Sequence, residues 1–224
     1  MHIAVCMIRV YLNVMGFLFM MLLSYLNAHF ITLEELSSVT NIDLNEIRHY
    51  QTERLMPLAS YNLDVELKCN SFFGEHSEKG VTEYYAKGYV SWLSIVHSLR
   101  NKECVFDEFT RRYLKTISTL KDVTCESGCS GLSEIITEKW EHFLQGTYGV
   151  CTKTGLPEDI ASKGIAVSQI EELLGHEELN SSEIKRLEYF VNLLDSVSSP
   201  FAPHERLKSS RHRLVDEVRR KYKL

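Results

Sequence analysis

Two helix starts lie close together near the N-terminal end of the chain, and they constrain the fold more than any other feature. Thr32 followed by Glu35 fits a capping box, in which each side chain bonds the other residue's backbone amide. Asp43 followed by Glu46 repeats the pattern with an aspartate as the cap. The segment between the two starts is long enough only for a turn, and Pro57 cannot continue a helix. The stretch therefore predicts a helix-turn-helix.

Four short segments of this stretch carry a family resemblance: Thr32–Leu36, Thr40–Ile42, Ile47–Tyr50 and Leu55–Pro57. Together they resemble the opening of the MerR-type winged helix-turn-helix regulators. The resemblance implies a second helix that enters the major groove of DNA, and a wing and further helices that follow it. It assigns the DNA contacts to Asn45, Arg48, His49 and Arg54.

The charge of the same region argues against DNA binding, which is largely neutralisation of phosphates by Lys and Arg. Between Ile31 and Leu67 there are seven acidic residues and two bases, so the region has a formal charge of −5. The second helix begins with Asp43 and Glu46, and both would repel a phosphate. Nucleic-acid binding is therefore only an alternative function for this region. The other possibility is that the same fold has a structural role or contacts another protein.

The composition is that of a globular protein of one or two domains. The chain has 224 residues, of which 44% are hydrophobic and 25% are charged. Its net charge of −5 gives no overall attraction to nucleic acid or to acidic lipid. Six cysteines at irregular spacing favour reduced thiols, so we expect a cytoplasmic protein.

A loop at residues 121–131 is a candidate boundary between an N-terminal module, residues 25–120, and a C-terminal domain, residues 132–224. The loop contains Cys125 and Cys129, but a zinc site normally needs further cysteines or histidines at matching spacing. No metal is predicted here, and no motif in the chain predicts a cofactor.

Residues 1–24 form an apolar N-terminal extension, and three interpretations of it remain open. Residues 10–26 are strongly apolar and follow Arg9, which is typical of a short anchor in the inner membrane. Translation could instead begin at Met20 or Met21, which would leave a normal entry into the first helix. The third interpretation is a buried core helix.

The remaining pattern predicts a mainly α fold, with a winged-helix-like N-terminal module followed by an α-helical C-terminal domain. Tyr61–Leu67 alternates apolar and polar residues, which indicates a half-buried strand that would suit a wing, and residues 75–80 read as a polar loop. We expect helices at Glu83–Leu99, Phe106–Leu120, Ser133–Leu144, Pro157–Lys163, Val167–Leu174 and Ser182–Leu194.

The C-terminal segment His204–Leu224 is strongly basic and predicts an amphipathic helix. It contains eight bases and three acids, a charge of +5, while Leu207, Leu214, Val218 and Tyr222 form an apolar stripe. Arginine suits the planar geometry of carboxylates and phosphates. The arginines could therefore hold an anionic ligand, contact nucleic acid or the acidic N-terminal module, or pair with the protein's own acids.

A second resemblance spans nearly all of the chain after residue 24. Trp140–Cys151 and Phe201–Arg206, with Phe30–Leu33 and Ser71–Gly74, resemble an uncharacterised bacterial family whose members are commonly labelled natural product biosynthesis proteins. The resemblance implies no established reaction or cofactor. It suggests one site that contains His204, Arg206, Ser209, Ser210, Arg211, Arg213 and Asp216.

These observations favour an accessory or ligand-binding protein of bacterial specialised metabolism that holds an anionic group through its arginine-rich C-terminal helix. Its partner would be a small anionic ligand or another protein, with a membrane partner only if residues 10–26 are an anchor. One alternative is a MerR-like DNA-binding regulator. The other is an enzyme of unknown reaction with His204 as its acid–base group.

Overall fold

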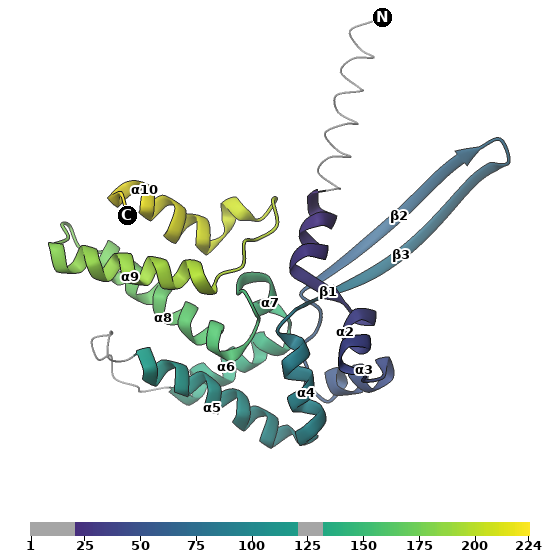
Figure 1. Cartoon of the computed structure of the whole chain (residues 1–224), viewed down its shortest axis with the longest axis horizontal. Coiled ribbons are helices and arrows are strands. Elements are labelled where there is room, and N and C mark those ends of the chain that lie inside the picture. The colour runs from purple at the N-terminus through teal and green to yellow at the C-terminus, as the bar shows by residue number, and fades with distance from the viewer. Residues whose placement is uncertain (1–20, 121–131) are drawn as a thin grey trace, which may run out of the picture.

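A computed structural model of the protein describes residues 21–120 and 132–224. Within these ranges the fold is mostly helical, with a small three-stranded antiparallel sheet near the N-terminus (Figure 1). Residues 1–20, with most of the apolar extension, and the Cys125–Cys129 loop lie outside the described residues. No helix of the described ranges is both long enough and apolar enough to cross a bilayer.

The predicted helix-turn-helix is present as α2 (Leu33–Thr40) and α3 (Leu44–Thr52), preceded by the short strand β1 (Phe30–Thr32). The first capping box is confirmed: Glu35 N donates to Thr32 Oγ1 at 3.2 Å, and Thr32 N donates to Glu35 Oε2 at 2.8 Å. Asp43 caps α3 by accepting from Asn45 N at 2.8 Å. These local signals fix where both helices begin.

The strands β2 (Tyr61–Ser71) and β3 (Gly74–Ala86) form a long two-stranded ribbon that projects from the body (Figure 1). The strand order is β1-β3-β2, and β1 pairs with the base of β3 at residues 84–86. The predicted polar loop at residues 75–80 is wrong, as is the helical start at Glu83, because both belong to β3. Their polar side chains fit a strand here because both faces of the outer ribbon are open to solvent.

Six helices lie between the ribbon and the C-terminal segment in the described part of the chain: α4 (Tyr89–Leu99), α5 (Lys102–Leu120), α6 (Leu132–Leu144), α7 (Thr147–Cys151), α8 (Pro157–Leu174) and α9 (Ser181–Val197). The two helices predicted at 157–163 and 167–174 are a single helix, α8. Gly164 lies in its middle, where a glycine costs only about 1 kcal/mol relative to alanine. Packing on α5 and α9 outweighs that cost.

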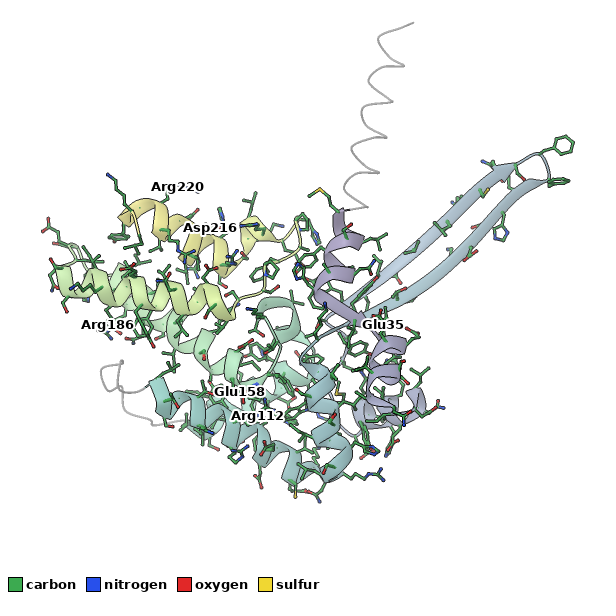
Figure 2. The ribbon with its side chains drawn as sticks, in the orientation of Figure 1. Glu35, Arg112, Glu158, Arg186, Asp216 and Arg220 are labelled. Atoms are coloured by element: carbon green, nitrogen blue, oxygen red, sulfur yellow. The ribbon has the colours of Figure 1, made fainter. Side chains whose placement is uncertain are left out.

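An aromatic core joins the helix-turn-helix to the helices after it. Trp92 is fully buried, and its ring centroid lies 4.9 Å from that of Phe143 and 6.4 Å from that of Phe109. The same cluster of buried side chains extends from α2 to the first turn of α8. Arg112 of α5 and Glu158 of α8 add a two-point contact of 2.7 and 2.8 Å (Figure 2). The two predicted domains thus contribute to a common core, and the division between them stays a prediction.

The C-terminal segment packs on α8 and α9 as a second apolar cluster, but the predicted single helix His204–Leu224 is wrong. It consists of a short turn η2 (Arg206–Lys208), a π-helical turn η3 (His212–Asp216) and α10 (Glu217–Tyr222). Ser209 interrupts the helix because its Oγ accepts from His212 N at 3.1 Å and donates to Arg206 O at 2.7 Å. Leu207 therefore leaves the apolar stripe and is 77% exposed.

Gly146 positions the turn between α6 and α7 against the segment that leads into β2. Its φ is +77°, a conformation that side-chain-bearing residues rarely adopt. A Cβ atom at this position would lie 2.6 Å from the carbonyl oxygens of both Leu58 and Ala59. The close backbone contact holds α7 beside the sheet, where it forms one wall of a cleft.

Candidate functional site

The cleft lies where the sheet, α7 and the C-terminal helices meet, and its volume is about 450 Å³. β1 and β3 form one side with Phe30 and Ala86, and the region of α7 forms another. The end of α9, the segment after it and one arginine of α10 complete the wall. Polar lining side chains come from all of these parts: His29, Thr152, Lys153, Asn192, Asp195, Ser196, Ser198, Ser199 and Arg219.

The segment after α9 is fixed to the end of α7 by backbone contacts. Thr152 and Ser198 form an isolated antiparallel bridge, and Lys153 N donates to Val197 O at 2.8 Å. Ser199 Oγ bonds the Tyr25 hydroxyl at 3.1 Å. The hydroxyl of Ser198, in contrast, is buried and has no hydrogen-bond partner among the described residues. A buried polar group without a partner is costly, and this hydroxyl is enclosed by protein atoms beside the cleft.

The charges at the cleft are positive overall. Asp195 accepts hydrogen bonds from both Arg211 and Arg219, the latter at 2.8 Å, and Arg219 also donates to Asn192 Oδ1 at 2.7 Å. One carboxylate therefore faces two guanidinium groups, and Lys153 adds an exposed ammonium on the side of α7. Burial acts to raise the pKa of Asp195, but the two arginines outweigh it and hold that pKa below its usual value. The ion cluster retains positive charge that an anion can neutralise.

Asp195 gives a prediction for stability against pH. Replacing it with asparagine should lower the free energy of unfolding by about 1–3 kcal/mol at neutral pH, because charge-assisted hydrogen bonds to two arginines are lost. The folded-state pKa lies below the ordinary value of 3.8. The stabilisation is therefore present above that value and is lost as the pH falls through the folded-state pKa.

Urea unfolding of the parent and Asp195→Asn chains at neutral pH and at about pH 3 measures this dependence. We expect the difference between the two chains to shrink at the acidic pH. An equal difference at both pH values would show that the carboxylate's charge is not what stabilises the contact.

Three arginines of the predicted anion site are paired with carboxylates of the chain itself. Arg206 lies 3.8 Å from Asp216, Arg213 lies 2.9 Å from Glu171, and Arg211 contacts Asp195. The sequence analysis left open whether these arginines would pair with acidic residues of the protein itself, and in the structure these three do. Arg211 is the member of the predicted set that touches the cleft's ion cluster.

The other predicted members lie apart from the cleft. Ser209 is buried and uses its hydroxyl to cap the helix that follows, while Ser210 is the next residue on that helix. The side chain of His204 is 60% exposed and lies 3.7 Å from Glu205 Oε1. Anion binding by this predicted set stays a prediction, as does the role of His204.

Two of the four predicted DNA contacts, Arg48 and Arg54, are engaged within the chain, and no side-chain hydrogen bond holds Asn45 or His49 among the described residues. Arg48 lies 2.8 Å from Glu83, and Arg54 contacts Glu141. The folded chain adds bases that sequence reasoning on the helix-turn-helix did not count, because Arg100 and Lys102 lie beside α3 in a cleft with His49, Glu46 and Glu53. Arg100 is 3.5 Å from Glu46, so these bases are set among acids rather than gathered into a positive surface.

Sequence reasoning missed Lys153, Asp195, Ser198 and Arg219. A signal for Arg219 was present, because Arg211, Val215 and Arg219 recur every four residues and so share one helix face. No pattern in the sequence indicated that this face would meet Asp195. In the residues that the structure describes, no group of three or more His, Cys, Asp and Glu side chains is placed to hold a metal ion.

Comparison with known proteins assigns the chain to a family. Neither a curated protein nor a solved structure matches the chain. The model of a family of unknown function, DUF6058, matches residues 105–223. The matched region contains Lys153, Asp195, Ser198 and Arg219, whereas the helix-turn-helix and the ribbon precede it. Because the match covers more than half of the chain, the protein belongs to this family of unknown function.

Proposed function

We propose that the protein is an accessory, ligand-binding protein of bacterial specialised metabolism that holds a small anionic group in the cleft between the sheet, α7, α9 and α10. The observation that carries the proposal is the ion cluster in which Arg211 and Arg219 share Asp195. Lys153 supplies a further positive charge across the cleft. The setting in specialised metabolism rests on the sequence resemblance to natural product biosynthesis proteins.

The geometry supports a carboxylate or a phosphate as the anionic group. Arg219 presents a guanidinium whose planar donors suit either group, and 35% of its side chain remains exposed. Asn192 and Ser196 also line this wall and add neutral polar side chains. Phe30, Ala86 and Pro200 provide apolar contact for the remainder of the ligand. A few polar groups on a partly apolar wall are typical of small-molecule sites.

We further propose that α2, α3 and the ribbon form a winged-helix-like unit, because a helix-turn-helix followed by an antiparallel hairpin is the order that the MerR resemblance implies. We do not favour DNA binding for it. The strands of the wing, residues 61–86, contain five acids and two bases, and Arg48 and Arg54 already contact carboxylates. Such a surface would repel the phosphates of a duplex.

Native mass spectrometry of the full chain purified from its own host tests the proposed function. We expect a non-covalent adduct whose fragments include a phosphate or carboxylate, and which is lost when the protein is denatured. Calorimetric titrations with inorganic phosphate, with succinate and with a short DNA duplex accompany it. Binding of the duplex with a steep salt dependence, together with no response to either small anion, would replace this proposal with the DNA-binding alternative.

A further inference from the structure

The helix that follows Ser209 contains one turn of unusual geometry. In the π-helical turn η3, the amide of Glu217 donates to the carbonyl oxygen of His212, five residues earlier instead of the four of an α-helix. Turns of this kind are rare, and they occur frequently at functional sites. Because a regular α-turn is the default, contacts that form only in the π register must favour it here.

The π turn changes which residues share a face of this helix. Arg211 and Arg219 are eight residues apart, and eight residues of α-helix rotate through about 800°, which would leave the two about 80° apart. A π turn takes up one additional residue, so the same eight residues rotate about as far as seven, and the two differ by only about 20°. In this alignment Arg211 and Arg219 contact the two oxygens of one carboxylate, that of Asp195. In an α-helix, Arg219 would turn about 100° away from that contact and from the cleft.

One contact of the His212 ring forms only in the π register. Its Nε2 lies 3.5 Å from Glu217 Oε1, and its Nδ1 lies 3.4 Å from Asp216 Oδ2. The contact with Asp216, four residues on, also forms in an α-helix. Glu217 is five residues on, which in an α-helix is about 140° around the axis and out of reach. A contact made in one of two conformations shifts the balance toward that conformation, so the His212–Glu217 contact stabilises the π turn.

The apolar packing of the segment does not choose between the two registers by itself. Leu214 and Val218 belong to the cluster that packs on α8 and α9. They are four residues apart, a separation that keeps both on the same side of an α-turn and of a π turn. The polar contacts of the turn therefore decide the rotation of α10 about its axis.

We propose that His212 is a positioning residue for the cleft. Through Glu217 it holds the π turn, and the π turn directs Arg219 toward Asp195 and the cleft. This inference rests on the proposed function, because Arg219 is the residue that binds the anion there. His212 does not line the cleft, so it acts through Arg219 and not by touching the ligand. Asp216, a member of the sequence-predicted site, holds the other side of the His212 ring.

NMR spectroscopy of the deuterated full chain tests the turn directly. A long-range HNCO experiment correlates an amide with the carbonyl that accepts its hydrogen bond. In the parent chain we expect the amide of Glu217 to correlate with the carbonyl of His212. In Glu217→Ala, and in His212→Phe, which keeps a ring but has no donor, we expect the correlation of residue 217 to move to the carbonyl of Arg213. A correlation with Arg213 in the parent, or no change in either variant, would overturn the proposal.

Calorimetric titration of the same chains with inorganic phosphate tests the consequence for the cleft. By charge alone, removing an acid from α10 should strengthen the binding of an anion. We expect Glu217→Ala to weaken it instead, by about two- to fivefold, the range of a partly exposed ion pair. Glu188→Ala removes an exposed acid of α9 and should leave phosphate binding unchanged or strengthen it. Stronger binding by Glu217→Ala would contradict the positioning role.

A double-mutant cycle separates positioning from a general loss of structure. Arg219→Gln leaves no guanidinium to position, so adding His212→Phe to it should cause no further loss of phosphate affinity. Added to Arg220→Gln, the same substitution should still weaken binding by about two- to fivefold. Equal losses in both backgrounds would show that His212 acts independently of Arg219.

The readouts distinguish a failure of this inference from a failure of the proposed function. A parent chain that binds neither phosphate nor succinate refutes the anion site and, with it, the role given to His212. A parent chain that binds phosphate, with unchanged affinity in Glu217→Ala and His212→Phe, refutes the positioning role and leaves the anion site in place.

Discussion

Replacing Trp92 with alanine is expected to lower the free energy of unfolding by about 3–5 kcal/mol, the usual cost of removing a large buried aromatic side chain. Trp92 is fully buried, and its ring contacts those of Phe109, Trp140 and Phe143. Its Nε1 also donates to Leu55 O at 3.0 Å, just after the helix-turn-helix. The residue therefore joins α4, α5 and α6 to the segment that carries α2 and α3.

Urea unfolding monitored by circular dichroism measures this effect, with two comparison variants. Trp92→Phe retains much of the volume but leaves the Leu55 carbonyl without its donor, so we expect an intermediate loss of about 1–3 kcal/mol. Leu207→Ala changes an exposed side chain and should shift the free energy by less than about 0.5 kcal/mol. A loss below about 1 kcal/mol for Trp92→Ala would mean that the aromatic cluster is not the main core.

Replacing Arg219 with glutamine is expected to weaken the binding of inorganic phosphate by about ten- to a hundredfold. The variant removes a charge-assisted hydrogen bond, which is worth about 1.5–3 kcal/mol, from the wall of the cleft. Asp195 keeps its contact with Arg211, so the local fold should remain. Isothermal titration calorimetry of the parent and variant chains gives the two dissociation constants.

The adjacent Arg220 provides a matched control for this experiment. It is exposed on the outer side of α10 and does not line the cleft (Figure 2). Arg220→Gln changes the net charge by the same amount, so any long-range electrostatic effect is equal in both variants. Equal weakening by the two substitutions would mean that phosphate responds to the overall charge of α10 rather than to a contact with Arg219.

The elements that the sequence predicted correctly depend on short-range signals. The capping residues Thr32 and Asp43 mark the starts of α2 and α3, because a cap acts on amides two or three residues away. Asn180 does the same for α9, which begins at Ser181, one residue before the predicted start at Ser182. Each capping contact joins residues within one helical turn of each other. The start of a helix can therefore be predicted from the residue types alone, without knowledge of the tertiary fold.

The incorrect predictions involve contacts that the local pattern does not contain. Residues 75–80 have no apolar side chain on either face, so alternation gives no strand signal, and only pairing with β2 makes them a strand. The C-terminal helix breaks at Ser209, although Arg206, Arg213 and Arg220 recur every seven residues, a spacing that suggests one continuous helix. In the first region the hydrogen-bond ladder with β2 supplies a structure that the pattern does not indicate, and in the second the Ser209 side-chain hydrogen bonds interrupt one that it does.

The cleft is beyond local prediction for a related reason. Phe30, Lys153, Asp195 and Arg219 lie far apart in the chain and meet only in the folded protein. The sequence indicated that the arginines of the C-terminal segment would meet anions, and it left open whether those anions were a ligand or the protein's own acids. The fold pairs Arg206 and Arg213 with single carboxylates but gives Asp195 two arginines.

The most direct test of the central claim is a titration of the isotopically labelled full chain with inorganic phosphate, followed by ¹H–¹⁵N NMR spectroscopy. The claim is that an anionic group binds in the cleft walled by Arg219, Lys153 and Ser198. It predicts that the largest saturable shifts occur at the backbone amides of Lys153, residues 196–199 and Arg219. Largest shifts at residues 204–213, or at α3, would contradict it and would place the anion on the C-terminal turn or on the helix-turn-helix.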